Sequence, residues 1–138
     1  MNNAETVQQM YDAFLRGDVQ AILDRVSDEV EWEYGAGPSD IPWLQTRRGR
    51  AGVAEFFSSL QGVEFHRFEP TTIFEKDRLV VALFDVEFTV LSTGKKIVEE
   101  DEAHIWHFDD QGRVIRFRHR LDTLLHKEAL EGVSELVS

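Results

Sequence analysis

Ionisable side chains gather in the stretch 98–121, and their types and spacing suit acid/base chemistry. Glu102, His104 and His119 lie there among apolar residues. A histidine has an unperturbed pKa of about 6.5 and can exchange protons near neutral pH, and a neighbouring carboxylate orients its ring. If the three side chains converge, His119 could transfer protons on a bound ligand together with His104 or Glu102.

A β-hairpin would bring these residues together. Asp109-Asp110-Gln111-Gly112 lies between two apolar runs and predicts the turn. Opposed residues of paired strands share one face of a sheet. The expected inward pairs are Phe108 with Arg113, Trp106 with Ile115, His104 with Phe117, and Glu102 with His119. The expected outward residues of the second strand are Val114, Arg116, Arg118 and Arg120.

The same residues also have structural explanations. The two histidines can be core residues whose nitrogens are satisfied by Glu102, by Tyr11 or by water. Tyr11 can be a core tyrosine with one hydrogen bond, or it can take part in the chemistry. Glu102, His104 and His119 could bind a metal, but no helical or loop ligand signature accompanies them, so we predict no metal and no other cofactor. The other histidines lack convergent partners and are interpreted as surface or strand-edge residues: His66, His107 and His126.

The elements that must position these residues follow from hydrophobic periodicity. Spacing of 3.6 predicts helices over 3–16, 18–26 and 50–61, and a last turn or two over 123–130. Alternation after residue 62 predicts antiparallel strands, preceded by a short strand around 30–34. A helical half followed by a long curved antiparallel sheet predicts an α+β cone, with the sheet wrapped around the first helix.

Two other stretches carry expectations about a ligand and a partner. Residues 35–48 form a Gly- and Pro-rich stretch that is long enough for a lid. The outward face of the sheet combines charged residues with apolar ones, and a sheet that is apolar on both faces normally has both covered. We therefore expect a homodimer. The residues expected on that face are Val81, Leu83, Ala103, Ile105, Asp85, Glu87, Glu99 and Asp101.

Composition narrows the classes of function. A chain of 138 residues predicts a single domain over 1–138. Its 26 acidic and 15 basic residues give a net charge of -11, which disfavours nucleic acid and anionic lipid as partners. No stretch suits a membrane span or a signal peptide, so we expect a cytoplasmic protein. The absence of cysteine excludes disulfides and thiol catalysis.

Several motifs together resemble one known family. The sequence is similar to the SnoaL-like branch of the nuclear transport factor 2-like (NTF2-like, cystatin-like) superfamily, which includes ketosteroid isomerases, limonene epoxide hydrolases and polyketide cyclases. The resemblance implies a cone-shaped homodimer whose subunits each hold a deep apolar pocket. The motifs that carry it are MYDAFLRGDVQAIL, SDEVEWEY, RRGRAGVAEFF, STGKK and WHFDDQGRVIRFRHRLD.

The resemblance also implies roles for individual residues. Tyr11 matches the oxyanion-hole tyrosine of the isomerases, and His104 falls near their protonated aspartic acid. Tyr34 stands where their general base, an aspartate, is expected, which argues against the same mechanism. His119 lies where the hydrolases and cyclases carry an acid/base aspartate. Phe84 and Val86 replace the arginine and aspartate of the hydrolase triad.

Two readings of function remain open from the sequence. The first is an acid/base isomerase, cyclase or hydrolase acting on a small apolar ligand with a carbonyl or epoxide group. The second is a non-catalytic ligand-binding or dimeric interaction domain. The four residues expected to carry the chemistry are His119, His104, Glu102 and Tyr11. The expected pocket walls, which suit a flat apolar ligand, are Trp32, Tyr34, Trp43, Phe84, Val86, Trp106, Phe117 and Leu121.

Overall fold

The helices form where the sequence has both helical periodicity and capping residues. The computed structural model describes residues 2–33 and 40–131. Helix α1 (Asn3–Leu15) begins with a capping box between Asn2 and Glu5, and Gly17 follows its end at a φ of +76°. The side chain of Asp18 caps α2 (Val19–Leu23) by accepting from the backbone N–H of Ala21. The later helices are α3 (Gly49–Ser59), which a 3₁₀ turn (Leu60–Gly62) extends, and α4 (Thr123–Leu130).

A six-stranded sheet supplies most of the rest of the described structure. The strands follow the order β2-β1-β6-β5-β4-β3 across the sheet. Neighbouring strands are antiparallel except β1 and β6, which pair in parallel. The second helix is shorter than predicted, because the chain is already extended at Val26. The strands are β1 (Val26–Glu33), β2 (Arg47–Arg48), β3 (Val63–Lys76), β4 (Leu79–Val90), β5 (Lys96–Phe108) and β6 (Val114–Arg120).

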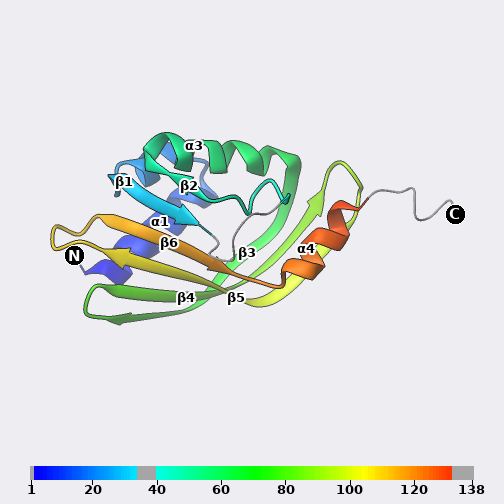
Figure 1. The fold of residues 1–138 in the computed structure, drawn as a ribbon. Coiled ribbons are helices and arrows are strands. Elements are labelled where there is room, and N and C mark those ends of the chain that lie inside the picture. Colours follow the sequence, from blue (N-terminus) through cyan, green and yellow to red (C-terminus); the bar gives the residue numbers. More distant parts are fainter. Residues whose placement is uncertain (1, 34–39, 132–138) are drawn as a thin grey trace, which may run out of the picture.

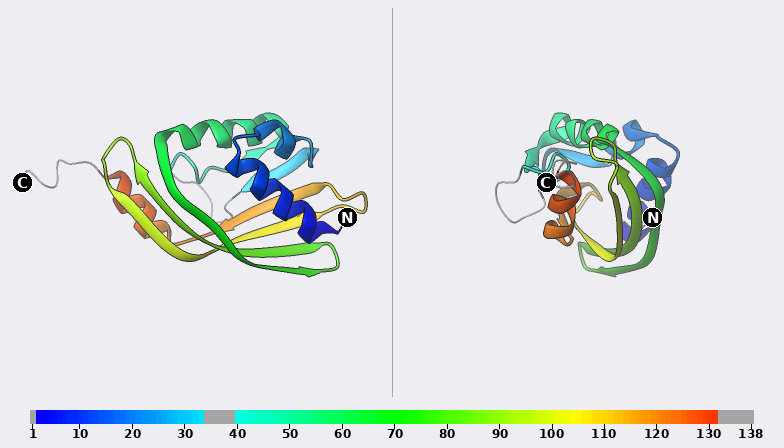
Figure 2. Two further views of the ribbon diagram at one scale, coloured as in Figure 1. Left: turned by 180° about the vertical axis from the view of Figure 1, so that it is seen from behind. Right: turned by 90° about the vertical axis from the view of Figure 1, so that its right-hand side faces the viewer.

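The sheet curves around the helices. Figure 1 shows α1 crossing the concave side of the sheet, with α3 running along the opposite side of the core. Seen along the long axis, the strands curve around the interior of the molecule, and α4 lies at one end (Figure 2). This is the α+β cone that the change of period after residue 62 predicts. No helix among residues 2–33 and 40–131 is long and apolar enough to cross a membrane.

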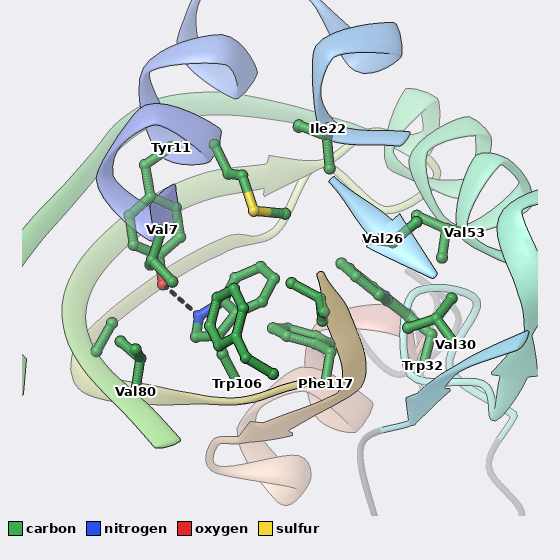
Figure 3. Packing of buried hydrophobic residues seen from close by; sticks show 14 of the residues in the cluster. Val7, Tyr11, Ile22, Val26, Val30, Trp32, Val53, Val80, Trp106 and Phe117 are labelled. Carbon is green, nitrogen blue, oxygen red and sulfur yellow. Dashed lines mark hydrogen bonds between the residues drawn. The ribbon is translucent and has the colours of Figure 1, made fainter. Parts of the chain in front are cut away.

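Aromatic residues from several elements fill the centre of the cone. Trp32 of β1 stacks on Phe117 of β6 with ring centroids 4.1 Å apart, and Trp106 of β5 packs against Phe117 at 4.6 Å. Tyr11 reaches this group from α1, as Figure 3 shows. The part of the segment 35–48 that the structure describes also packs inward, because Ile41, Trp43 and Leu44 are buried. Residues 35–39 of the expected lid lie outside the described residues.

A bulge in β6 makes the predicted hairpin register wrong. Phe108 pairs with Val114 and His107 with Arg116, so Ile115 is an extra residue on β6. Val114 is consequently buried and Ile115 exposed, the reverse of the expectation. Beyond the bulge the pairing is displaced by an even number of residues, which keeps His119 on the inner face. His119 therefore lies opposite His104, and Glu102 lies one inward position further along β5.

A second bulge, in β5, changes which residues face inward. Phe84 pairs with Glu102 but Val86 pairs with Glu99, so β5 has one residue more than β4 at this point. Asp101 occupies the bulge with a φ of +59°, and its N–H donates to the Asp85 carboxylate at 3.1 Å. The prediction that Glu99 faces outward is wrong, because its side chain bonds to a buried histidine of α4.

Candidate functional site

A cavity lies between the concave face of the sheet and the helices. Its volume is about 90 Å³. Its lining is mostly aromatic, with a polar end formed by β5, β6 and α4. The aromatic residues of the lining include Phe14, Phe56, Phe57, Phe65, Phe68 and Phe88.

The expected pocket walls can be compared with this lining. The cavity is lined by these predicted residues: Trp32, Trp43, Phe84, Val86, Trp106 and Phe117. Leu121 is not among the lining residues that the structure describes, because β6 ends at Arg120 and the chain turns into α4. Leu121 packs instead against a neighbouring core cluster. Tyr34 lies outside the described residues.

Tyr11, Trp106 and His104 form one hydrogen-bonded chain. The Trp106 indole N–H donates to the Tyr11 hydroxyl at 3.2 Å, and this hydroxyl lies 2.8 Å from Nδ1 of His104. An indole only donates, and the phenol has one proton. Both hydrogen bonds therefore form when the Tyr11 hydroxyl accepts from Trp106 and donates to Nδ1 of His104. His104 is then the neutral tautomer with its proton on Nε2, and no described residue accepts from that nitrogen.

Burial determines whether the side chains of Tyr11 and His104 are charged. Burial raises the pKa of the Tyr11 phenol far above neutrality, against a smaller lowering by the Trp106 hydrogen bond. Burial and then the charge of His119 lower the pKa of His104 well below its ordinary value, against an opposing effect of Glu102. At neutral pH the phenol is therefore protonated and the imidazole uncharged. Such an imidazole keeps one N–H as a hydrogen-bond donor and is not a cation.

Glu102 and His119 form a carboxylate–imidazole pair on the adjacent strands. Oε1 of Glu102 lies 2.7 Å from Nε2 of His119. Burial raises the pKa of Glu102, but the hydrogen bonds of His119 and His126 lower it more, so this carboxyl is ionised. A carboxylate only accepts, so His119 donates through Nε2, and in the neutral form of the ring Nδ1 carries the lone pair. The ring centroids of His119 and His104 are only 4.6 Å apart.

Sequence reasoning missed the histidine of α4. His126 was expected at the surface, but only 1% of it is exposed and it lines the cavity. Its Nε2 lies 3.2 Å from Oε2 of Glu102 and 2.8 Å from Oε1 of Glu99. Its Nδ1 accepts from the indole N–H of Trp43 at 3.0 Å. The only sequence signal for this arrangement was the capped helix 123–130, whose apolar side includes position 126.

The pKa values of two neighbouring carboxyl groups are shifted in opposite directions. Burial raises the pKa of Glu99, and the adjacent Glu102 raises it further, against lowering by the hydrogen bonds of His126 and of the Asp122 backbone. Glu102 moves in the opposite direction, as described above. Pairs of carboxyl groups whose environments separate their pKa values in this way are characteristic of acid/base sites.

One buried donor in the cavity wall has no partner among the residues that the structure describes. Trp32 is only 3% exposed, and no hydrogen-bond acceptor lies within reach of its indole N–H in the described structure. An unsatisfied buried donor costs about 1–3 kcal/mol, and few remain in native proteins. A ligand oxygen next to Trp32 would remove this cost.

Three solved structures are similar to this chain over most of its length. An NTF2-like protein of unknown function from Burkholderia pseudomallei is 25% identical, with a TM-score of 0.83 over 96% of this chain and 100% of that one. TerC, crystallised with polyporic acid, is 27% identical, with a TM-score of 0.77 over 92% of this chain and 96% of that one. A candidate polyketide cyclase from Pseudomonas putida shares the fold at 19% identity, with a TM-score of 0.79 over 95% and 99% of the two chains.

The match to a family extends over most of the elements that build the site. No curated protein matches the sequence at a significant level. The model of the SnoaL-like domain family matches residues 7–117, from α1 through Phe117 of β6. The chain therefore belongs to the SnoaL-like domain family, within the NTF2-like superfamily.

Proposed function

We propose that this protein is an acid/base enzyme of the isomerase or cyclase type that acts on a small, flat, largely apolar carbonyl compound. The observation that carries the proposal is the 2.7 Å pair of Glu102 and His119, placed on the wall of an aromatic cavity beside the neutral His104. A base and a hydrogen-bond donor are then adjacent, as the removal of a proton next to a carbonyl group requires.

Each residue has a defined task in this reaction. Nδ1 of His119 takes a proton from the carbon next to the ligand carbonyl, and Glu102 stabilises the imidazolium that forms. The electron pair of the broken C–H bond moves onto the carbonyl oxygen, where the Nε2–H of His104 donates to it. Tyr11 acts through His104 by fixing its tautomer. His119 then returns the proton to another carbon in an isomerisation, or to the alkoxide formed when the enolate carbon attacks a second carbonyl of the same ligand.

The lining supports a ligand class rather than a single compound. Flat rings suit walls made by Trp32, Phe117 and Trp106. The unpaired indole N–H of Trp32 favours a ligand with a second oxygen, in addition to the carbonyl held by His104. The 27% identity to TerC, which was crystallised with polyporic acid, supports an aromatic oxygenated ligand for this chain as well.

Exchange of hydrogen for deuterium tests the chemistry without knowledge of the natural substrate. Flat benzo-fused cyclic ketones such as 1-indanone and 2-tetralone would be incubated with the protein in D₂O, and loss of the signal of the α-hydrogens would be followed by NMR. The protein should accelerate exchange, and His119→Ala should reduce the acceleration by about 10²- to 10⁴-fold, the usual contribution of a general base. His107→Ala is the matched control, because His107 belongs to β5 but is not among the cavity residues.

The alternative function predicts a different result in the same experiment. The polar groups of Glu102 and Tyr11 are all engaged within the protein, which also suits a cavity that only binds. A non-catalytic binding protein would show quenching of tryptophan fluorescence by these ketones but no acceleration of exchange. Equal exchange rates in the original protein and His119→Ala would likewise refute the enzyme proposal.

A further inference from the structure

A continuous hydrogen-bonded chain connects the segment 40–46 to the proposed base. It runs from the Trp43 indole to Nδ1 of His126 at 3.0 Å, and from Nε2 of His126 to Oε2 of Glu102 at 3.2 Å. It continues from Oε1 of Glu102 to His119 at 2.7 Å. Trp43 and His126 are 83 positions apart in the sequence, and both line the cavity.

The donor and the acceptor of every hydrogen bond in this series can be assigned, because the Trp43 indole can only donate and the Glu102 carboxylate can only accept. The Trp43 indole can only donate, so Nδ1 of His126 accepts and carries no proton. A neutral imidazole then has its proton on Nε2, which donates to Glu102 and, at 2.8 Å, to Glu99. With Oε2 of Glu102 engaged in this way, Oε1 is left for the Nε2–H of His119.

Two effects on the charge of His126 oppose one another. Burial lowers its pKa, whereas the hydrogen bonds and charges of Glu102 and Glu99 raise it and favour the cation wherever Nδ1 is free to take up a proton. The cation would carry a proton on Nδ1, directly facing the N–H of Trp43. Protonation therefore requires that the Trp43 bond break, and the geometry with this bond intact has a neutral His126.

The assigned donors and acceptors argue against a metal ion bound between Glu99, Glu102 and His126. Ligand atoms of Glu99, Glu102 and His126 lie within 4.8 Å of one another, close enough to share an ion. A histidine that binds through Nε2 normally donates a proton from Nδ1 to an acceptor. Nδ1 of His126 faces a donor instead, so this donor set suits proton positioning better than metal binding.

We propose that Trp43 and His126 are positioning residues for the proposed base: Trp43 holds His126 as a neutral Nε2–H donor, and His126 locks Glu102 in the orientation that serves His119. The hydrogen-bond directions stand on geometry alone, whereas the consequence for turnover rests on the proposed function. The groups that face His126 are Glu99 and Glu102 from β5, together with Trp43 from the segment 40–46.

The directions are tested by NMR of ¹⁵N-labelled histidines, with the His126 signals assigned by their loss in His126→Gln. In the original protein at neutral pH, Nδ1 of His126 should be unprotonated and Nε2 protonated. Trp43→Phe removes the opposing donor but keeps an aromatic ring, so His126 should become the cation with both nitrogens protonated. Trp32→Phe is the matched control for this spectrum, because it alters a cavity tryptophan for which the described part of the chain offers no hydrogen-bond partner.

Each outcome of the NMR experiment decides the point. Two protonated nitrogens on His126 in the original protein would overturn the proposal, and so would a Trp43→Phe spectrum that matches the original one. The spectrum of the original protein is decisive by itself if Trp43→Phe does not fold. None of these readouts needs turnover, so a failure of the enzyme proposal is seen separately, in the ketone exchange experiment.

The consequence for chemistry is tested with the pH profile of ketone exchange. A cationic His126 would partly neutralise the negative charge of Glu102. Glu102 would then stabilise a protonated His119 less, and His119 would be a weaker base. Trp43→Phe should therefore lower exchange on the order of tenfold, as is common for partners that orient a functional histidine, and move the acidic limb of the profile to lower pH. His126→Gln should keep the limb in place, since an amide can accept from Trp43 and donate to Glu102, whereas His126→Leu should not. A loss of rate with an unmoved acidic limb in Trp43→Phe would indicate a purely structural role.

Discussion

Residues that can only donate a hydrogen bond determine the protonation pattern of the cavity. The indoles of Trp106 and Trp43 are each the first donor in a series of hydrogen bonds. In each series the first donor determines which atom of every following group carries the proton. The first series ends at His104, which presents an N–H. The second ends at His119, which presents a lone pair. In the proposed reaction, the hydrogen-bond donor His104 and the base His119 would thus lie side by side.

The buried His104 makes stability depend on pH. Its folded-state pKa is well below the ordinary 6.5, so the unfolded chain takes up a proton that the folded chain refuses. This penalty is absent above pH 6.5 and grows as pH falls below it, by roughly 1.4 kcal/mol per pH unit for one proton. In His104→Asn, whose amide oxygen can still accept from Tyr11, the free energy of unfolding should fall less steeply below pH 6.5.

Urea unfolding at a series of pH values measures this difference. The quantity to compare is the slope of the unfolding free energy against pH in the two proteins. The absolute values differ in any case, because the smaller Asn side chain lowers stability at every pH. The change in slope isolates His104 from Glu99, whose raised pKa acts in the opposite sense above pH 4.5. Parallel curves for the two proteins would show that His104 is protonated in the folded state.

At the scale of elements, alternation in the sequence predicted the strands but not their bulges. In β4 the alternation is regular, and every second residue is buried: Val80, Ala82, Phe84, Val86, Phe88 and Val90. The bulges at Ile115 and Asp101 add one residue each, and period-2 reasoning has no signal for such an insertion. His126 was missed for another reason, since its partners Trp43 and Glu99 come from an irregular segment and from a bulged strand.

The β5 bulge should tolerate glycine and resist β-branched residues. Asp101 has a φ of +59°, where a β-branched side chain collides with its own backbone. Asp101→Val should lower the free energy of unfolding by about 1–2 kcal/mol, and Asp101→Gly should change it by less than about 0.5 kcal/mol. Glu100→Val is the control, because Glu100 is exposed and outside the positive-φ region. Chemical unfolding of the three variants decides the matter, and equal losses in the two valine variants would contradict a conformational cause.

At the scale of the molecule, the sheet has a second face that the helices do not cover. The concave face holds the cavity, whereas apolar residues on the outer face stay partly exposed in a single chain. Leu83 pairs with Ala103, and Val81 pairs with Ile105, so these residues are neighbours across β4 and β5. Phe74 of β3 pairs with Val81, and Val98 of β5 pairs with Glu87, so both lie on the outer face. Each of the two side chains is more than half exposed. An apolar surface of this kind normally marks an interface.

We propose that a second copy of the chain covers this face. Sedimentation at about 50 µM should show a dimer, since an interface of ordinary size buries roughly 800 Å² on each partner. Leu83→Glu would add a carboxylate to the strand that already carries Asp85 and Glu87, and it should give a monomer with an intact fold. Leu15→Glu is the matched control, because Leu15 is 59% exposed at the end of α1, on the helical side of the sheet, and its variant should stay dimeric. A monomeric original protein, or dissociation by both substitutions alike, would place the interface elsewhere or remove it.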